Sequence, residues 1–191
     1  VWKLEGDNYT YTILPHPAFV YAAKFLQRED SEAVSVVTAG RDSIIRIWRN
    51  RQGMQSFELV QELKHPIVNK FTYITSIVTR NADTFYTSSS TGDIIEWTMR
   101  SSRDYHLNRN FRLIDIREKI INHMDLNPRG NKIYFRVQDA TNSELSNSIF
   151  VLGIATGEIT QKFQQLYLES QGRVKVTPCG TQIFCTNGSV I

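Results

Sequence analysis

The sequence predicts an all-β fold built from one antiparallel sheet unit that is repeated along the chain. Short runs rich in β-branched and aromatic residues alternate with polar turns, and no stretch shows sustained helical periodicity. Trp2, Trp48 and Trp97 are separated by 46 and 49 residues, close to the roughly 40–45 residues of one four-stranded propeller blade. We therefore expect consecutive blades of a β-propeller.

The repeat is clearest around Trp48. Residues 34–48 comprise two β-rich runs on either side of a polar turn, which predicts a hairpin that ends in a half-buried tryptophan. Residues 87–97 repeat this pattern, with a polar turn before Trp97. These two units set the register for the rest of the chain.

The expected strands follow from that register. The first complete copy has strands at 19–26, 33–38, 43–49 and 57–63, and the second at 73–79, 84–88, 93–98 and within 105–113. The third has strands at 120–126, 131–137, 148–153 and 158–163. In this third copy Leu152 stands in place of the tryptophan, and a polar insertion at 138–147 is expected to be a surface loop.

The two ends of the sequence predict partial blades. Residues 1–3 and 8–14 match a third and a fourth strand, and residues 173–177 and 181–186 match a first and a second. The expected divisions are 1–14 (end of a preceding blade), the blades 15–63, 64–113 and 114–163, and a partial blade 164–191. The sequence thus predicts an incomplete arc of three full four-stranded blades flanked by two partial blades. Both cut faces would expose apolar surface.

Composition argues against several classes of function. The net charge of +3 is small and dispersed, so no nucleic-acid partner is expected. The longest apolar runs fall well short of the roughly 20 residues that span a bilayer, and no signal peptide is expected. Cys179 and Cys185 should lie about 20 Å apart on an extended segment, beyond disulfide reach, which favours a reducing compartment. His106 and His123 have no partner at metal-ligand spacing, so neither a metal nor a cofactor is expected.

The repeats resemble those of WD-repeat β-propellers. Residues 14–25 and 42–48, the segment 177–181 and the third repeat without tryptophan resemble a WD-repeat protein of the cilium. That resemblance implies a non-catalytic scaffold for protein–protein interactions in the cytoplasm, at the ciliary transition zone and basal body. It further implies a role in cilium assembly and ciliary protein trafficking, with transition-zone proteins as partners. An adaptor of another complex, or a weakly basic propeller associated with nucleic acid, is the alternative.

The family pattern implies a structural relay of polar side chains. It links a His before the first strand, a Ser or Thr on the second, an Asp in the next turn and the Trp, and each group satisfies its neighbour's hydrogen bond. In the first repeat these positions are His16, Thr38, Asp42 and Trp48. The second repeat keeps His65, Thr87 and Trp97, with Thr91 at the Asp position. The third keeps none, and Lys3, Arg49 and Thr98 replace the Asp that follows Trp in the family's name-giving dipeptide.

The family also implies a protein-binding surface on the narrow face of the ring. The matching positions are Phe19, Tyr21 and Arg41 in the first full repeat and Tyr73, Thr75 and Ser90 in the second. Aromatic side chains and Arg are enriched at interface hot spots. Phe19 and Tyr73 could instead pack between blades.

Two other interpretations of these residues predict different behaviour. A catalytic interpretation makes His16 a general base that Asp42 orients, with Thr38 as nucleophile. A nucleic-acid interpretation uses Arg41 with the residues Arg46, Arg49 and Arg51, and predicts binding that weakens steeply with salt.

Overall fold

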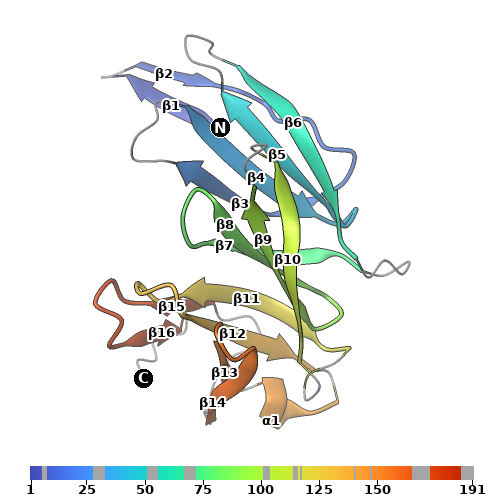
Figure 1. Ribbon diagram of the computed structural model, residues 1–191, viewed down its shortest axis with the longest axis vertical. Coiled ribbons are helices and arrows are strands. Elements are labelled where there is room, and N and C mark those ends of the chain that lie inside the picture. Colours follow the sequence, from blue (N-terminus) through green and yellow to red (C-terminus); the bar gives the residue numbers. More distant parts are fainter. Residues whose placement is uncertain are drawn as a thin grey trace.

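A computed structural model describes the protein at residues 1–5, 8–27, 33–50, 56–66, 72–100, 104–113, 116, 118–139, 141–146, 148–164 and 173–185. Its strands form three four-stranded antiparallel sheets and two two-stranded ones. Figure 1 shows that the three four-stranded sheets follow one another along the long axis of the molecule in chain order. They form an open arc, which confirms the predicted incomplete propeller.

Each four-stranded sheet is a meander whose strands pair in sequence order. The first contains β3 (Val20–Gln27), β4 (Val34–Gly40), β5 (Ile44–Asn50) and β6 (Phe57–Lys64). The second contains β7 (Ile74–Thr79), β8 (Thr84–Ser89), β9 (Asp93–Met99) and β10 (Tyr105–Arg112). The third contains β11 (Ile120–Leu126), β12 (Lys132–Gln138), β13 (Ser148–Gly153) and β14 (Glu158–Gln164).

A two-stranded hairpin stands at each end of the arc. One pairs β1 (Trp2–Glu5) with β2 (Asn8–Tyr11), and the other pairs β15 (Val174–Val176) with β16 (Ile183–Cys185). The expected surface loop between β12 and β13 contains a short helix, α1 (Ser143–Ser146). The Asn142 side chain accepts a hydrogen bond from the Leu145 backbone N–H (3.2 Å), and the Arg136 guanidinium donates to the Ser146 carbonyl (2.9 Å). The insertion is therefore tied to the third sheet.

The sheets share a set of bulges that fixes their register independently of sequence motifs. In each four-stranded sheet, one extra residue interrupts the pairing of the first strand with the second: Tyr21, Thr75 and Asn122. A second bulge interrupts the pairing of the outermost strand, beside Trp48, Trp97 and Leu152. Leu152 thus occupies the tryptophan position, as the sequence predicts.

Apolar cores lie between successive sheets. Val37, Ile45 and Ile47 of the first sheet pack with Phe85 and Trp97 of the second. A second cluster joins the second and third sheets, and a third joins the third sheet to the β15–β16 hairpin. Each sheet therefore covers one face of the next, as expected for a repeat array.

Candidate functional site

Thr38 is the centre of the predicted relay in the first sheet. The Trp48 Nε1–H donates to Thr38 Oγ1 (2.8 Å), and His16 Nε2 lies 2.7 Å from the same oxygen. His16 Nδ1 lies 2.7 Å from the Leu14 carbonyl oxygen, which can only accept, so Nδ1 carries a proton. In the neutral imidazole, Nε2 then accepts the Thr38 hydroxyl proton. This chain of bonds satisfies the indole N–H of Trp48, which is only 3% exposed.

Asp42 does not take the place that the relay assigns to it. Its Oδ2 lies 2.7 Å from Arg46 Nη1, and its Oδ1 accepts the backbone N–H of Ile44 (3.2 Å). The position facing His16 Nδ1 is occupied by the Leu14 carbonyl instead. The predicted contact from carboxylate to imidazole is therefore replaced, because a backbone oxygen satisfies the ring and an arginine attracts the carboxylate. The catalytic interpretation loses its orienting group by the same observation.

The second sheet repeats the inner half of the relay. The Trp97 Nε1–H donates to Thr87 Oγ1 (2.9 Å), ten residues earlier, as Trp48 does to Thr38. His65 is buried, and its backbone N–H donates to the Ser43 carbonyl (3.3 Å). Thr91, at the Asp position, donates to the Asp93 carboxylate (2.9 Å). The turn is thus held by a different set of polar contacts. The Trp2 side chain lies outside the described part of the structure.

The predicted binding residues lie at the starts of the first strands and in the turns after the second strands, an edge of the arc that we call the rim. Phe19 is 71% exposed and Tyr21 is 52% exposed. The Tyr21 and Tyr73 rings, from neighbouring sheets, have their centroids 5.5 Å apart. The exposed Arg41 donates its backbone N–H to the Phe19 carbonyl (2.9 Å). Phe19, Tyr21 and Arg41 therefore stand together.

The two hydroxyl-bearing rim residues serve the fold instead. Thr75 donates its hydroxyl to the Ile121 carbonyl of the third sheet and shares a second bond with Ser88 Oγ (2.8 Å). Ser90 Oγ accepts the Tyr73 backbone N–H (3.0 Å). Both hydroxyls are therefore engaged in hydrogen bonds within the fold. The rim side chains that remain for a partner are aromatic rings and the Arg41 guanidinium.

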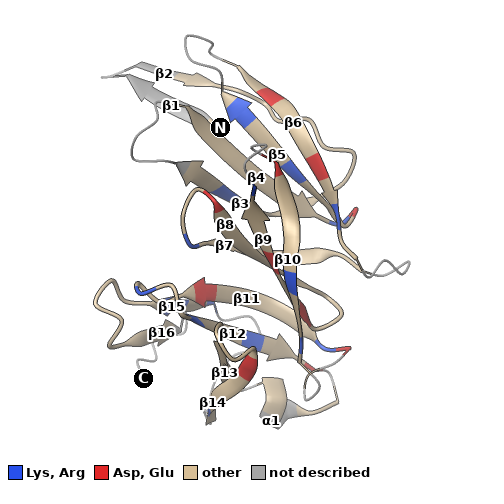
Figure 2. Ribbon diagram, in the orientation of Figure 1, with Lys and Arg blue, Asp and Glu red and all other residues tan. Residues whose placement is uncertain are grey.

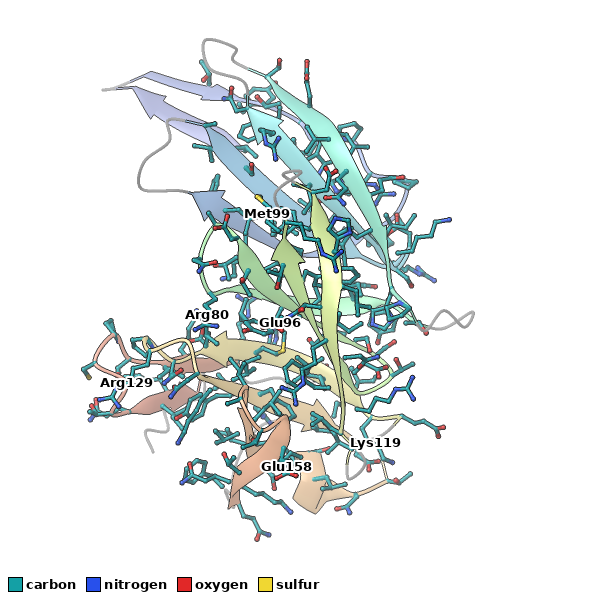
Figure 3. The ribbon with its side chains drawn as sticks, viewed as in Figure 1. Arg80, Glu96, Met99, Lys119, Arg129 and Glu158 are labelled. Atoms are coloured by element: carbon teal, nitrogen blue, oxygen red, sulfur yellow. The ribbon has the colours of Figure 1, made fainter. Side chains whose placement is uncertain are left out.

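Sequence reasoning missed the third-sheet part of the rim. Asn122 is the bulge residue equivalent to Tyr21 and Thr75, and its side-chain amide donates to Gln138 Oε1 (3.0 Å). Lys119 lies at the start of β11, and Figure 3 shows Arg129 at the opposite end of that sheet. The signal that could have found Asn122 is its spacing of 47 residues from Thr75, but bulges leave no mark in composition.

An ion pair marks the rim end of the third sheet. Lys119 Nζ lies 2.8 Å from Asp139 Oδ2, and Asp139 Oδ1 accepts two hydrogen bonds from Thr141. The Lys119 contact, followed by the Thr141 bonds, holds the pKa of the Asp139 carboxyl well below its ordinary value. Asp139 is thus ionised wherever the protein is folded near neutral pH.

Charges elsewhere are interspersed. Figure 2 shows that basic and acidic residues are mixed across the sheets. Arg46, one of the arginines in the nucleic-acid interpretation, is buried and contacts the carboxylates of Asp42 (2.7 Å) and Glu62 (3.0 Å). Arg51 lies outside the described residues. The predicted arginine group therefore does not present Arg46 to a phosphate backbone.

The fold is that of a WD40 β-propeller. The chain superposes on the crystal structure of the WD40 β-propeller domain of Doa1 with a TM-score of 0.66 and 18% sequence identity, covering 92% of this chain and 51% of that one. Its sequence is similar to jouberin, 27% identical to the mouse (Mus musculus) protein and 26% identical to the rat (Rattus norvegicus) protein. Both alignments cover 96% of this chain and 17% of the jouberin sequence. No protein-family model matches the chain.

The comparisons thus place the fold of the chain in the class of WD40 β-propellers. Its sequence is similar to that of jouberin over 96% of its length. In the described part of the chain, no helix is long and apolar enough to cross a membrane.

Proposed function

We propose that this chain is a non-catalytic scaffold that binds partner proteins through the first-sheet part of the rim. The observation that carries the proposal is the grouping of Tyr21, Phe19 and Arg41 at exposed positions on a rigid sheet edge. The Tyr73 ring supports Tyr21, and a backbone hydrogen bond ties the Arg41 turn to Phe19. Side chains held in this way lose little conformational entropy on binding, which favours affinity.

The likeness to jouberin supports a more specific role. We propose that the partners are proteins of the ciliary transition zone and basal body, and that the scaffold acts in cilium assembly and ciliary protein trafficking. The basis is sequence similarity across 96% of the chain. The chain spans 17% of the jouberin sequence, so regions beyond this similarity stand outside the proposal.

The test separates the rim from the fold. Wild-type protein and the double variant Tyr21→Ala, Arg41→Ala are expressed at equal levels in ciliated cells, and nearby proteins are identified by proximity labelling. Leu59→Ala is the matched control, because Leu59 is an apolar residue on β6 that is 45% exposed. We expect the double variant to lose transition-zone proteins, with the control unchanged. Equal labelling by the double variant and the wild type would refute binding through the rim.

The cilium role has its own readout. Tagged wild-type protein is expected to concentrate at the base of the cilium, where fluorescence can be compared with a basal-body marker. A uniform cytoplasmic signal, combined with rim-dependent binding to other proteins, would exclude the ciliary assignment but retain the scaffold.

A further inference from the structure

Two cations of the first-sheet rim have no acid of the fold paired with them. Arg41 lies in the turn after β4, and Lys64 lies at the same end of the sheet, opposite Ile44 in the ladder between β5 and β6. Both side chains are exposed, and no described residue forms a hydrogen bond or an ion pair with either of them. Both charges can therefore attract a group from a partner.

The acids of this part of the rim are already engaged within the fold. Asp42 follows Arg41 in the chain. Its Oδ2 lies 2.7 Å from Arg46 Nη1, and its Oδ1 accepts the backbone N–H of Ile44 (3.2 Å). Glu62 lies 3.0 Å from Arg46 Nε. Because the buried Arg46 holds both carboxylates, neither of them competes for the Arg41 guanidinium.

Arg41 is held close to an exposed aromatic ring. Its backbone N–H donates to the Phe19 carbonyl (2.9 Å), and Gly40 permits this approach, because a Cβ on Gly40 would lie 1.9 Å from that carbonyl oxygen. Tyr21 lies two residues beyond Phe19, which is about 7 Å along an extended chain. Tyr21 is 52% exposed even though Tyr73 packs against it, with 5.5 Å between the ring centroids. Its exposure is therefore not caused by a missing neighbour.

We propose that the first-sheet rim binds an extended peptide segment of a partner protein, in which an Asp or Glu lies two residues from an apolar side chain; this inference rests on the function proposed above. The carboxylate accepts two parallel hydrogen bonds from the Arg41 guanidinium, the geometry that this pair favours. Alternate side chains of an extended segment lie on the same side, about 7 Å apart, so the apolar side chain packs on the Tyr21 ring. Lys64 attracts further acidic residues of the segment.

The charges of the rim favour a carboxylate over a phosphate group. Phosphorylated segments are generally bound by clusters of arginines, but Arg46, five residues beyond Arg41, is buried between two carboxylates. These carboxylates repel a dianion more strongly than a singly charged group. The third-sheet part of the rim fits an acidic segment less well, because Glu118 is exposed there and Lys119 already contacts Asp139 (2.8 Å). The proposed site is therefore confined to the first sheet and the adjoining Tyr73.

The test begins with a phage library of random peptides selected on the purified 191-residue chain. Peptides that bind the wild type but not Tyr21→Ala depend on the rim; they are synthesised with a fluorescent label, and their Kd is measured by anisotropy. We expect these peptides to be enriched in Asp or Glu two residues from an apolar residue. Arg41→Gln should weaken their binding about five-fold, as expected for an exposed ion pair. Arg129→Gln is the matched control, because Arg129 is exposed at the opposite end of the third sheet (Figure 3), and it should leave the Kd unchanged.

A change in the peptide tests the same ion pair on the unaltered protein. Replacing the acid of the peptide by its amide should weaken binding to the wild type as much as Arg41→Gln does. The two changes together should cost little more than either alone, because both remove one interaction. Circular dichroism establishes whether each protein variant is folded, and the amide peptide remains decisive if a variant misfolds.

Three results would overturn the inference. Rim-dependent peptides that lack acidic residues, or that bind Arg41→Gln as tightly as the wild type, would exclude the carboxylate but leave binding through the rim intact. A selection without any rim-dependent peptide would also overturn it, and the proximity labelling described above would then decide the proposed function separately. A phosphoserine in place of the acid that binds more than about ten-fold tighter, and only when Arg41 is present, would assign the site to a phosphorylated segment instead.

Discussion

Removing the hydroxyl of Thr38 should destabilise the protein through the indole of Trp48. Thr38→Val keeps the shape of the side chain but leaves the buried Trp48 Nε1–H without its acceptor at 2.8 Å. An unsatisfied buried donor costs roughly 1–3 kcal/mol. We expect the free energy of unfolding to fall by about 2 kcal/mol. The bond that His16 loses adds little to this figure, because His16 is partly exposed and can hydrogen-bond to water instead.

The assay is urea unfolding followed by far-UV circular dichroism, with the slope m required to match the wild type. Thr87→Val should cost a similar amount, since Thr87 accepts from the Trp97 indole at 2.9 Å. Thr98→Val is the control: Thr98 is half-buried on β9, and no described contact engages its hydroxyl.

A double-mutant cycle isolates the bond from other effects. Trp48→Phe removes the donor, so Thr38→Val should cost less in that background, with a coupling of about 0.5–3 kcal/mol. Additivity within about 0.5 kcal/mol, or a Thr38→Val variant as stable as the wild type, would refute the relay as described.

Three further predictions concern turns. Gly157→Ala should destabilise by about 1–3 kcal/mol, because Gly157 has φ +77° and a Cβ there would lie 2.1 Å from Arg109 Nη2; urea unfolding should show a smaller loss when Arg109 is already Ala. Two threonine hydroxyls, chiefly that of Thr177, lower the pKa of the Cys179 thiol to about 7; alkylation of this exposed thiol should have its midpoint near that pH, and Thr177→Val should move the midpoint upward. The Lys119 ammonium group beside Asp139 lowers the pKa of the Asp139 carboxyl. The ion pair therefore stabilises the fold fully above the ordinary carboxyl pKa of about 4, and this stabilisation is lost as the pH falls below that value. Asp139→Asn should remove this part of the acid sensitivity from unfolding curves.

The strands were predictable because each pairs an apolar alternation with a turn signal. The expected strands at 120–126 and 148–153 coincide with β11 and β13, and the others differ mainly at their ends. Strand ends are set by pairing and bulges, which the sequence pattern does not record. The helix α1 escaped prediction because four residues are too short for a helical period.

The partner of Asp42 was not predictable from composition. The sequence offers His16 and Arg46 as alternatives, and both attract a carboxylate. The structure decides between them, because the Leu14 carbonyl already occupies His16 Nδ1 and Arg46 brings its guanidinium within 2.7 Å of Asp42. A motif gives residue types at the right spacing, but competition with backbone acceptors settles which pairs form.

Exposure has different causes at the two aromatic residues of the first-sheet rim. Tyr73 occupies the same position in the second sheet as Phe19 in the first, and Tyr73 is half-buried because the tilted ring of Tyr21 from the preceding sheet packs against it. Phe19 is exposed because no described residue supplies that neighbour, so completing a blade before β3 would cover it. Tyr21 already has its neighbour and is still 52% exposed. A partner protein that binds the rim should therefore depend on Tyr21 and Arg41 whether or not the ring is closed, whereas dependence on Phe19 should disappear once the preceding first strand is in place.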